Sequence, residues 1–266
     1  MSSTALEAAL RRDRWIVLIA LLGITALTLG YTAWLALGFD MSGLMSPRYR
    51  PWSPGYFAFM FVMWVVMMVG MMTPSVAPMV LLYTAIARQQ RARDADGRGR
   101  FAAAGWFLAG YLLAWSAFAL SATFAQWLLE WRAWIAPMMA GTGRAPGGLM
   151  LIAAGIYQWL PAKQACLSSC RSPLAFVQRH GGFQPSARGS LRLGVLHGLD
   201  CIGCCWALML LLFAFGVMNL TWIAGLMVFV LLEKLVPWPR AVPRIAGALA
   251  VAGGAWMLMN SGGNAS

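Results

Sequence analysis

The sequence predicts an all-α fold: a polytopic bundle of about seven transmembrane helices with the N-terminus in the cytoplasm. Three observations predict this fold class. Hydrophobic residues make up 61% of the chain and charged residues only 11%, a composition outside the range of ordinary soluble domains. Apolar runs long enough to cross a bilayer recur along the chain, and basic residues gather in alternate segments between those runs.

Each apolar run is a candidate span, because a helix needs about 20 apolar residues to cross a hydrocarbon core roughly 30 Å thick. The runs are, in order, Trp15 to Gly38, Tyr56 to Ile86, Phe101 to Leu129, Gly147 to Leu160, Leu193 to Val217, Thr221 to Leu235 and Ile245 to Met259. The first is too long for the apolar part of a cleaved export signal, so we expect it to remain as a helix. The fourth has few clearly apolar turns before Pro161. We expect residues 1–14 to be a cytoplasmic N-terminal segment, residues 15–260 a transmembrane helical domain and residues 261–266 a C-terminal tail.

The basic residues set the orientation. They gather before the first run, between the second and third, between the fourth and fifth, and between the sixth and seventh, at residues 11–14, 88–100, 163–192 and 234–244. The remaining segments carry only Arg48, Arg50, Arg132 and Arg144. By the positive-inside rule the first set faces the cytoplasm, which predicts a multi-pass protein of the bacterial inner (plasma) membrane. Most of the basic residues behind the formal charge of +12 then face anionic lipid. No motif indicates a nucleic-acid partner.

The five cysteines all fall on or near the predicted cytoplasmic side. Cys166 and Cys170 lie in the basic segment before the fifth run, and Cys201, Cys204 and Cys205 lie in the first turns of that run. The cytosol is reducing, and an odd number of thiols favours metal binding or redox catalysis over a disulfide framework.

His197, Cys201 and Cys204 lie within about 60° of one another on a helix, and Cys205 flanks them. One helix rarely supplies every ligand of a metal ion, so we expect a second segment to take part. Three residues of the segment before the fifth run are candidate ligands: Cys166, Cys170 and His180. Glu233, near the end of the sixth run, is a further candidate. The alternatives are that the cysteines only pack between helices, that His180 is solvated, and that Glu233 and Lys234 anchor the helix end at the interface.

The second run is rich in methionine. A stripe at helical spacing includes Met67 and Met71, and thioethers suit copper(I), so these two are further candidate ligands along a path through the bilayer. Methionine is also an ordinary filler of apolar gaps. Pro74 and Pro78 each leave one helix carbonyl without its usual donor, which predicts either a simple kink or an ion-accessible site.

Four blocks of sequence resemble a bacterial family of predicted metal-binding integral membrane proteins, domain of unknown function 2182. The blocks are GMMTPSVAPMVLLY, GIYQWLPAKQACLSSCRSPLAF, LGVLHGLDCIGCCWALMLLLFAFGVMNL and LLEKL. The resemblance covers about residues 55–260, and the first apolar run lies outside it. It implies that the metal-site candidates are Cys166, Cys170, His197, Cys201, Cys204 and Cys205.

The leading functional hypothesis is a membrane protein that binds copper(I) for transport or for delivery to a metallochaperone or membrane enzyme partner. Zinc or iron also bind cysteine and histidine, so both stay open as the metal. One alternative is a membrane thiol-disulfide oxidoreductase, because Cys201-x-x-Cys204 has redox spacing. Another is a non-catalytic assembly subunit of a membrane metalloenzyme. Whether the protein is an enzyme is left open by the sequence.

Overall fold

The computed structural model describes residues 19, 22–23, 25–31, 52–91, 100–132, 144–216, 219–236 and 241–260. The regular structure of these residues is helical, which confirms the all-α prediction. The helices are α2 (Pro54–Arg91), α3 (Arg100–Trp131), α4 (Arg144–Tyr157), α5 (Pro161–Arg171), α6 (Pro173–Arg179), α7 (Ala187–Phe215), α8 (Leu220–Leu235) and α9 (Ala241–Met259). The predicted tails at 1–14 and 261–266, and most of the first predicted span, lie outside the described residues.

Four of the described helices, α2, α3, α7 and α9, are long and apolar enough to cross a membrane. The prediction of about seven spans is therefore not confirmed. Helix α4 has 14 residues and α8 has 16, which at 1.5 Å per residue gives about 21 and 24 Å, less than a hydrocarbon core needs. The fourth predicted run forms an apolar helix but is not confirmed as a span, because the chain leaves the helix after Tyr157 and starts α5 at Pro161.

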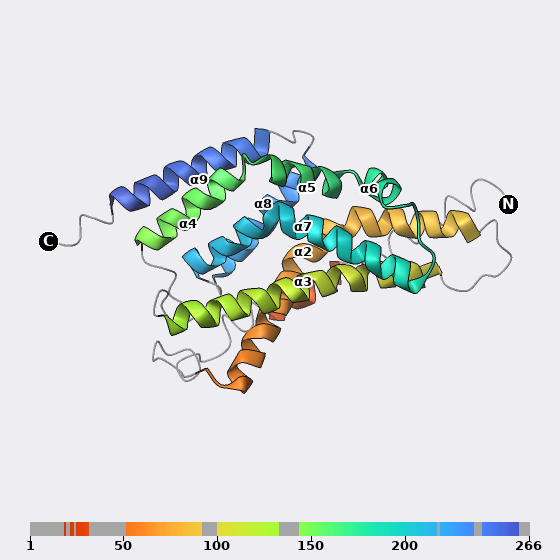
Figure 1. Cartoon of the computed structure of the whole chain (residues 1–266), viewed down its shortest axis with the longest axis horizontal. Helices are drawn as coiled ribbons and strands as arrows, with labels where there is room; N and C mark the ends of the chain where they lie inside the picture. Colours follow the sequence, from red (N-terminus) through yellow and green to blue (C-terminus); the bar gives the residue numbers. More distant parts are fainter. Residues whose placement is uncertain are drawn as a thin grey trace.

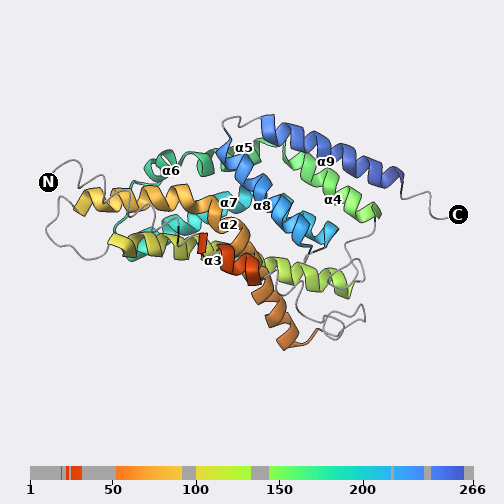
Figure 2. The same cartoon turned by 180° about the vertical axis from the view of Figure 1, so that it is seen from behind.

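Helix α2 changes direction near its middle, as both cartoon views show (Figures 1 and 2). The bend coincides with Pro74 and Pro78, which lie inside the helix. A proline removes one helical donor and crowds the carbonyl four residues earlier, so a bend at this point is expected. Two neighbouring hydroxyls bond back to the helix: Thr73 Oγ1 donates to the Val69 carbonyl at 2.6 Å and Ser75 Oγ to the Met72 carbonyl at 2.8 Å.

Helices α3 and α7 pack along each other with their backbones in close approach. At Gly194 of α7 a Cβ atom would overlap the Phe107 carbonyl oxygen of α3, and at Gly110 of α3 it would overlap the Leu191 carbonyl oxygen of α7. Both positions therefore need glycine. This contact fixes the depth of the α7 side chains against α3.

The short helices α5 and α6 form a return segment between α4 and α7, and α5 packs against the middle of α7. Pro161 and Pro173 stand at the first positions of α5 and α6, where proline lacks only a donor that is unpaired in any case. The segment is held to the bundle by Tyr83, whose hydroxyl donates to the Gln184 carbonyl at 2.9 Å.

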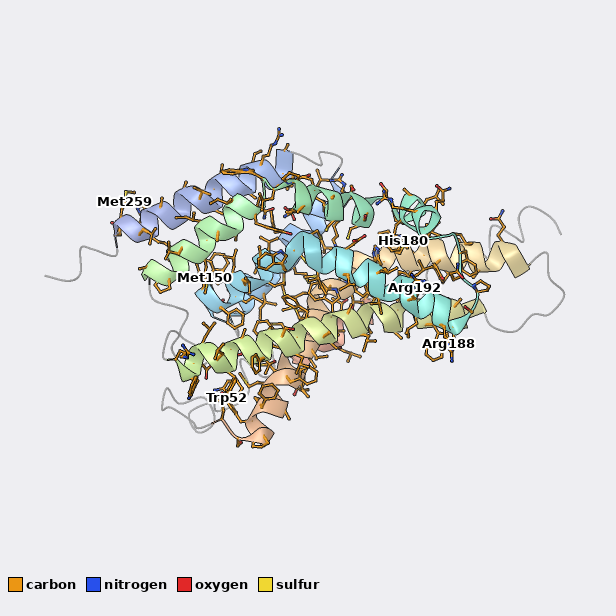
Figure 3. All side chains as sticks on the ribbon, in the orientation of Figure 1. Trp52, Met150, His180, Arg188, Arg192 and Met259 are labelled. Carbon is orange, nitrogen blue, oxygen red and sulfur yellow. The ribbon has the colours of Figure 1, made fainter. Side chains whose placement is uncertain are left out.

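Helices α4 and α9 pack along each other at the edge of the molecule, and α4 also packs against α7 (Figure 2). Side chains at the two ends of the molecule differ: Arg188 and Arg192 lie at one end, and Trp52, Met150 and Met259 lie toward the other (Figure 3). The core between the ends is built from α2, α3 and α7, and it contains most of the buried side chains, including Met67, Phe107 and Leu212.

Candidate metal centre

Three buried cysteines from two helices form the candidate centre. The sulfur atoms of Cys170 on α5 and of Cys201 and Cys204 on α7 all lie within 4.8 Å of one another. Cys201 and Cys204 are almost completely buried, and Cys170 is 9% exposed. We call this group the thiol cluster. Its dimensions suit a metal ion bound by sulfur, because ligands at about 2.3 Å from one ion lie roughly 4 Å apart.

Helix α5 is held against the end of α8 by two basic side chains, one near each end of α5. Lys163 Nζ donates to the two carboxylate oxygens of Glu233 at 2.7 and 2.9 Å, and both residues are buried. Lys163 also donates to the Gln158 side-chain oxygen. Arg171 donates to the Glu233 carbonyl at 3.0 Å and to the Val236 carbonyl. Cys170 therefore lies on a helix that is fastened to α8 at both ends.

Polar groups from three further helices converge on Cys201. Its sulfur lies 3.2 Å from the Tyr111 hydroxyl of α3 and 3.0 Å from the Lys234 ammonium of α8. Ser75 of α2 joins the group, since its hydroxyl oxygen lies 3.0 Å from Lys234 Nζ and 3.2 Å from the Tyr111 hydroxyl. The positive charge beside the sulfur would balance the negative charge of a thiolate.

Cys204 and Cys205 bond back to the helix. The Cys204 thiol donates to the Cys201 carbonyl at 3.1 Å, and the Cys205 thiol donates to the same carbonyl at 2.9 Å. Cys205 is fully buried but lies outside the group of sulfurs that are mutually within 4.8 Å.

Cys170 lies on a connecting helix, and its protonation is set by its neighbours. Hydrogen bonding to Cys201 and to Cys204, together with burial, raises the pKa of the Cys170 thiol well above its usual value. At neutral pH the metal-free site therefore keeps this proton. Metal binding must release it, because the thiolate is the ligand form.

The cluster lies deeper in the helix than the sequence indicates. The sequence predicts Cys201 in the first turns of its span, but α7 already begins at Ala187, where Ser186 caps it by accepting from the Gly189 amide at 3.2 Å. Cys201 is thus about 21 Å along the helix axis. The start of α7 cannot be predicted from hydropathy, because Arg188 and Arg192 lie in its first turns and charged residues are excluded from an apolar run.

Cys166 lies on α5 with Cys170 but outside the thiol cluster. A Cβ atom at Gly203 of α7 would come within 2.7 Å of the Cys166 sulfur, so this thiol packs against the α7 backbone. The residue is partly exposed. Burial, and then the carboxylate of Asp200, raise the pKa of the Cys166 thiol.

His197 is 2% exposed and lies one turn before Cys201. Its ring is surrounded by aromatic rings, with centroids 5.8 Å from Phe107, 6.0 Å from Tyr111 and 5.0 Å from Phe176. The Nδ1 atom is buried and has no hydrogen-bond partner within the described part of the chain. The ring is not in the group of ligand atoms mutually within 4.8 Å. An orphaned buried nitrogen beside a candidate metal site is a ligand-binding feature.

Two further candidates are held away from the thiol cluster. His180 follows the last residue of α6, and its ring centroid lies 4.4 Å from that of Phe176 at a tilt of 38°. Its Nδ1 atom lies 2.9 Å from the Phe176 carbonyl oxygen. The Glu233 carboxylate is engaged by Lys163. Lys234 is not among the candidates that the sequence predicts, because a lysine at a helix end is expected to extend to the headgroups. The only signal for its position is that it follows Glu233 at the same helix end.

The methionines of α2 are buried in the same core as the thiol cluster. Met67 is 1% exposed and Met71 is completely buried, and five neighbours on the helix are buried as well: Met60, Met63, Met68, Met72 and Met79. This row passes the cluster at Met72, whose carbonyl accepts from the Tyr111 hydroxyl at 3.1 Å.

A comparison with curated proteins gives no match, and neither does a comparison with solved structures. A family model does match, and it covers residues 61–257, a range that includes every residue of the thiol cluster and Lys234. The model is that of PpoB2, described as a copper chaperone. With three quarters of its length matched, the chain belongs to this copper chaperone family.

Proposed function

We propose that the protein is an integral membrane protein that binds copper(I) at Cys170, Cys201 and Cys204 and delivers it to a membrane partner or enzyme. The observation that carries the proposal is the set of three buried sulfurs, within 4.8 Å of one another, in a chain of a copper chaperone family. Soft sulfur ligands select copper(I), zinc and iron–sulfur clusters over harder metal ions, and the family description favours copper among these. Two helices supply these ligands, so the metal would also tie α5 to α7.

Copper(I) fits the described ligand set better than zinc does. Structural zinc sites are four-coordinate, and among the described residues only three ligand atoms lie mutually within 4.8 Å. Iron bound by sulfur in clusters also takes four thiolates per site. His197 would orient or complete the site when a metal binds, since its Nδ1 atom has no hydrogen-bond partner within the described chain.

The buried methionines supply a route away from the cluster. Met67 and Met71 are the proposed exchange positions, because they lie on the buried face of α2 that reaches the cluster at Met72. From Met60 to Met72 the helix rises about 18 Å. Thioethers bind copper(I) more weakly than thiolates, so they suit transfer and not storage.

A bilayer is the proposed setting. Four helices are long and apolar enough to cross it, and Arg188 and Arg192 lie at one end of the molecule (Figure 3). In the proposed orientation that end faces the cytoplasm of a bacterial cell, where the inner-membrane lipids are anionic. A metallochaperone would supply copper at this side, and a membrane enzyme would receive it.

Elemental analysis of the detergent-purified full chain, prepared anaerobically and loaded with copper(I), tests the proposal. Wild type should hold equimolar copper, and Cys170→Ser should lose it. The matched control is Cys166→Ser, which changes the same residue type on the same helix at a thiol outside the cluster. This control should keep its copper.

Two results would overturn the proposal. The first is wild-type protein that stays metal-free after loading. The second is equal loss of copper in Cys166→Ser and Cys170→Ser, because this would mean that the cluster has no special role. All five thiols are free in the structure, so a reversible disulfide between Cys170 and Cys201 or Cys204 in metal-free protein would favour the oxidoreductase alternative.

A further inference from the structure

Lys234 places a full positive charge against the thiol cluster. Its ammonium nitrogen lies 3.0 Å from the Cys201 sulfur and 3.0 Å from the Ser75 hydroxyl oxygen. A lysine near a helix end ordinarily extends toward water. Here α8 turns the side chain inward, toward α2 and α7.

The charge on Lys234 has a different environment from the charge on Lys163. Lys163 is paired with the Glu233 carboxylate at 2.7 Å. Among the described residues no such ion pair joins Lys234 to a carboxylate, and its hydrogen-bond partners are a thiol sulfur and a hydroxyl. The charge of Lys234 is therefore free to act on whatever occupies the thiol cluster.

We propose that Lys234 is a specificity-determining residue, whose fixed positive charge makes the thiol cluster favour the monovalent copper(I) ion over divalent ions. The proposal rests on the function proposed above. An ion bound to the Cys201 sulfur at about 2.3 Å lies at most about 5.3 Å from the ammonium nitrogen. At that separation the repulsion is substantial in a buried site, and it doubles when the ion carries two charges.

The thiolates alone have the opposite preference. Three negative charges attract a divalent ion more strongly than a monovalent ion, because Coulomb attraction also scales with the charge of the ion. The ammonium group offsets part of that advantage without adding a ligand. It does so only because its nitrogen is held by Ser75 and faces Cys201.

The test measures two affinities in the full chain under anaerobic conditions, for copper(I) buffered with bicinchoninate and for Zn²⁺ buffered with a chromophoric chelator. The variants are Lys234→Leu, which removes the charge and adds no donor atom for copper, and Lys234→Arg, which keeps the charge. In Lys234→Leu the ratio of copper(I) to zinc affinity should fall by roughly tenfold to 100-fold. In Lys234→Arg it should stay near the wild-type ratio.

A matched control separates charge from packing. The double variant Lys163→Met with Glu233→Gln removes a buried lysine and its carboxylate together, so the net charge beside the cluster does not change. Both affinities should fall in parallel if α5 loosens, and their ratio should not change. If Lys234→Leu does not fold, Ser75→Ala releases the ammonium nitrogen instead, and the ratio should fall in the same direction by a smaller factor.

The outcomes separate this inference from the proposed function. Copper(I) binding with an unchanged ratio in Lys234→Leu would overturn the role of Lys234 and leave the copper site standing. A fall of the ratio in the double variant as large as in Lys234→Leu would also overturn it. Wild-type protein that binds no copper(I) would overturn the proposed function, and the specificity proposal with it.

Discussion

The contact between α3 and α7 and the contact between α4 and α9 are both made by glycine, yet they support different parts of the molecule. In the first, Gly194 lies against the Phe107 carbonyl and Gly198 against Ala114. In the second, a Cβ atom at Gly254 would lie 2.5 Å from the Gly148 carbonyl oxygen. Small residues allow the same close backbone approach at both contacts.

The difference lies in what surrounds each contact. One turn beyond Gly198 the α3–α7 contact sets the Tyr111 hydroxyl against the Cys201 sulfur. At Gly148, Gly155 and Gly254 of the α4–α9 contact, the nearest side chains are apolar: Leu258, Val251 and Ile152. Close approach of two helix backbones therefore serves packing in both regions. It contributes to a site only at α3 and α7, where polar side chains from α5 and α8 lie against the contact.

Buried charge is the largest energetic difference between the two regions, and Lys163→Met tests it. The substitution leaves the Glu233 carboxylate buried without its cation, which costs about 3–5 kcal/mol of unfolding free energy. Helix α5 should also loosen, so copper affinity should fall. Unfolding by denaturing detergent, followed by helix content, measures the stability loss.

The double variant Lys163→Met with Glu233→Gln completes this experiment. It should recover much of the lost stability, because no uncompensated charge remains. If the single variant is as stable as wild type, buried charge is not what distinguishes the thiol region from the α4–α9 pair.

The glycine contacts themselves give the next prediction. Gly194→Ala forces α3 and α7 apart and should cost about 1–3 kcal/mol or more, with a sharp loss of bound copper because Tyr111 and Cys201 separate. Gly254→Ala should lower stability by a similar amount and keep equimolar copper. Thermal unfolding and elemental analysis of both variants check the pair. Equal copper loss in both variants would show that the thiol cluster depends on the whole bundle and not on one contact.

Much of the fold follows from apolar length alone. The runs that became α2, α3, α7 and α9 are long and weakly charged, and that is all a spanning helix requires. The start of α7 could not be placed from this signal, because Arg188 and Arg192 lie in its first turns. The short α4 and α8 show that an apolar run predicts a helix more securely than it predicts a span.

The sequence predicts that cysteines form a metal site, but it does not predict which of the cysteines belong to it. Cysteines on one face of α7 indicated a centre, and the need for a second segment indicated the stretch that became α5. Whether Cys166 or Cys170 completes the cluster depends on the rotation of α5, which the ties of Lys163 and Arg171 to α8 set. Such long-range pairings leave no local pattern. The inward direction of Lys234 has the same origin.

A smaller effect is expected at Tyr111, whose hydroxyl connects the α3–α7 contact to the cluster. Tyr111→Phe removes the hydrogen bonds to the Cys201 sulfur and the Met72 carbonyl and keeps the ring. One hydrogen bond contributes about 0.5–1.5 kcal/mol, so copper affinity should fall by up to about tenfold. Competition with bicinchoninate measures this. Trp115→Phe is the control on the same helix, because the Trp115 Nε1 atom has no hydrogen-bond partner in the described residues. A larger loss in the control would contradict a specific role for the Tyr111 hydroxyl.

The smallest effect concerns Cys166, which shares α5 with Cys170 and lies outside the cluster. Burial, and then the Asp200 carboxylate, raise the pKa of its thiol. Alkylation requires the thiolate, so the rate with iodoacetamide should be slow at neutral pH and should still be rising above about pH 8.5, the usual pKa of a cysteine. Tandem mass spectrometry of the tryptic peptide 164–171 separates Cys166 from Cys170. In Asp200→Asn the rate profile should move to lower pH, because the carboxylate no longer disfavours the thiolate, while a profile unchanged from wild type would mean that burial alone sets the thiol chemistry on this side of α5.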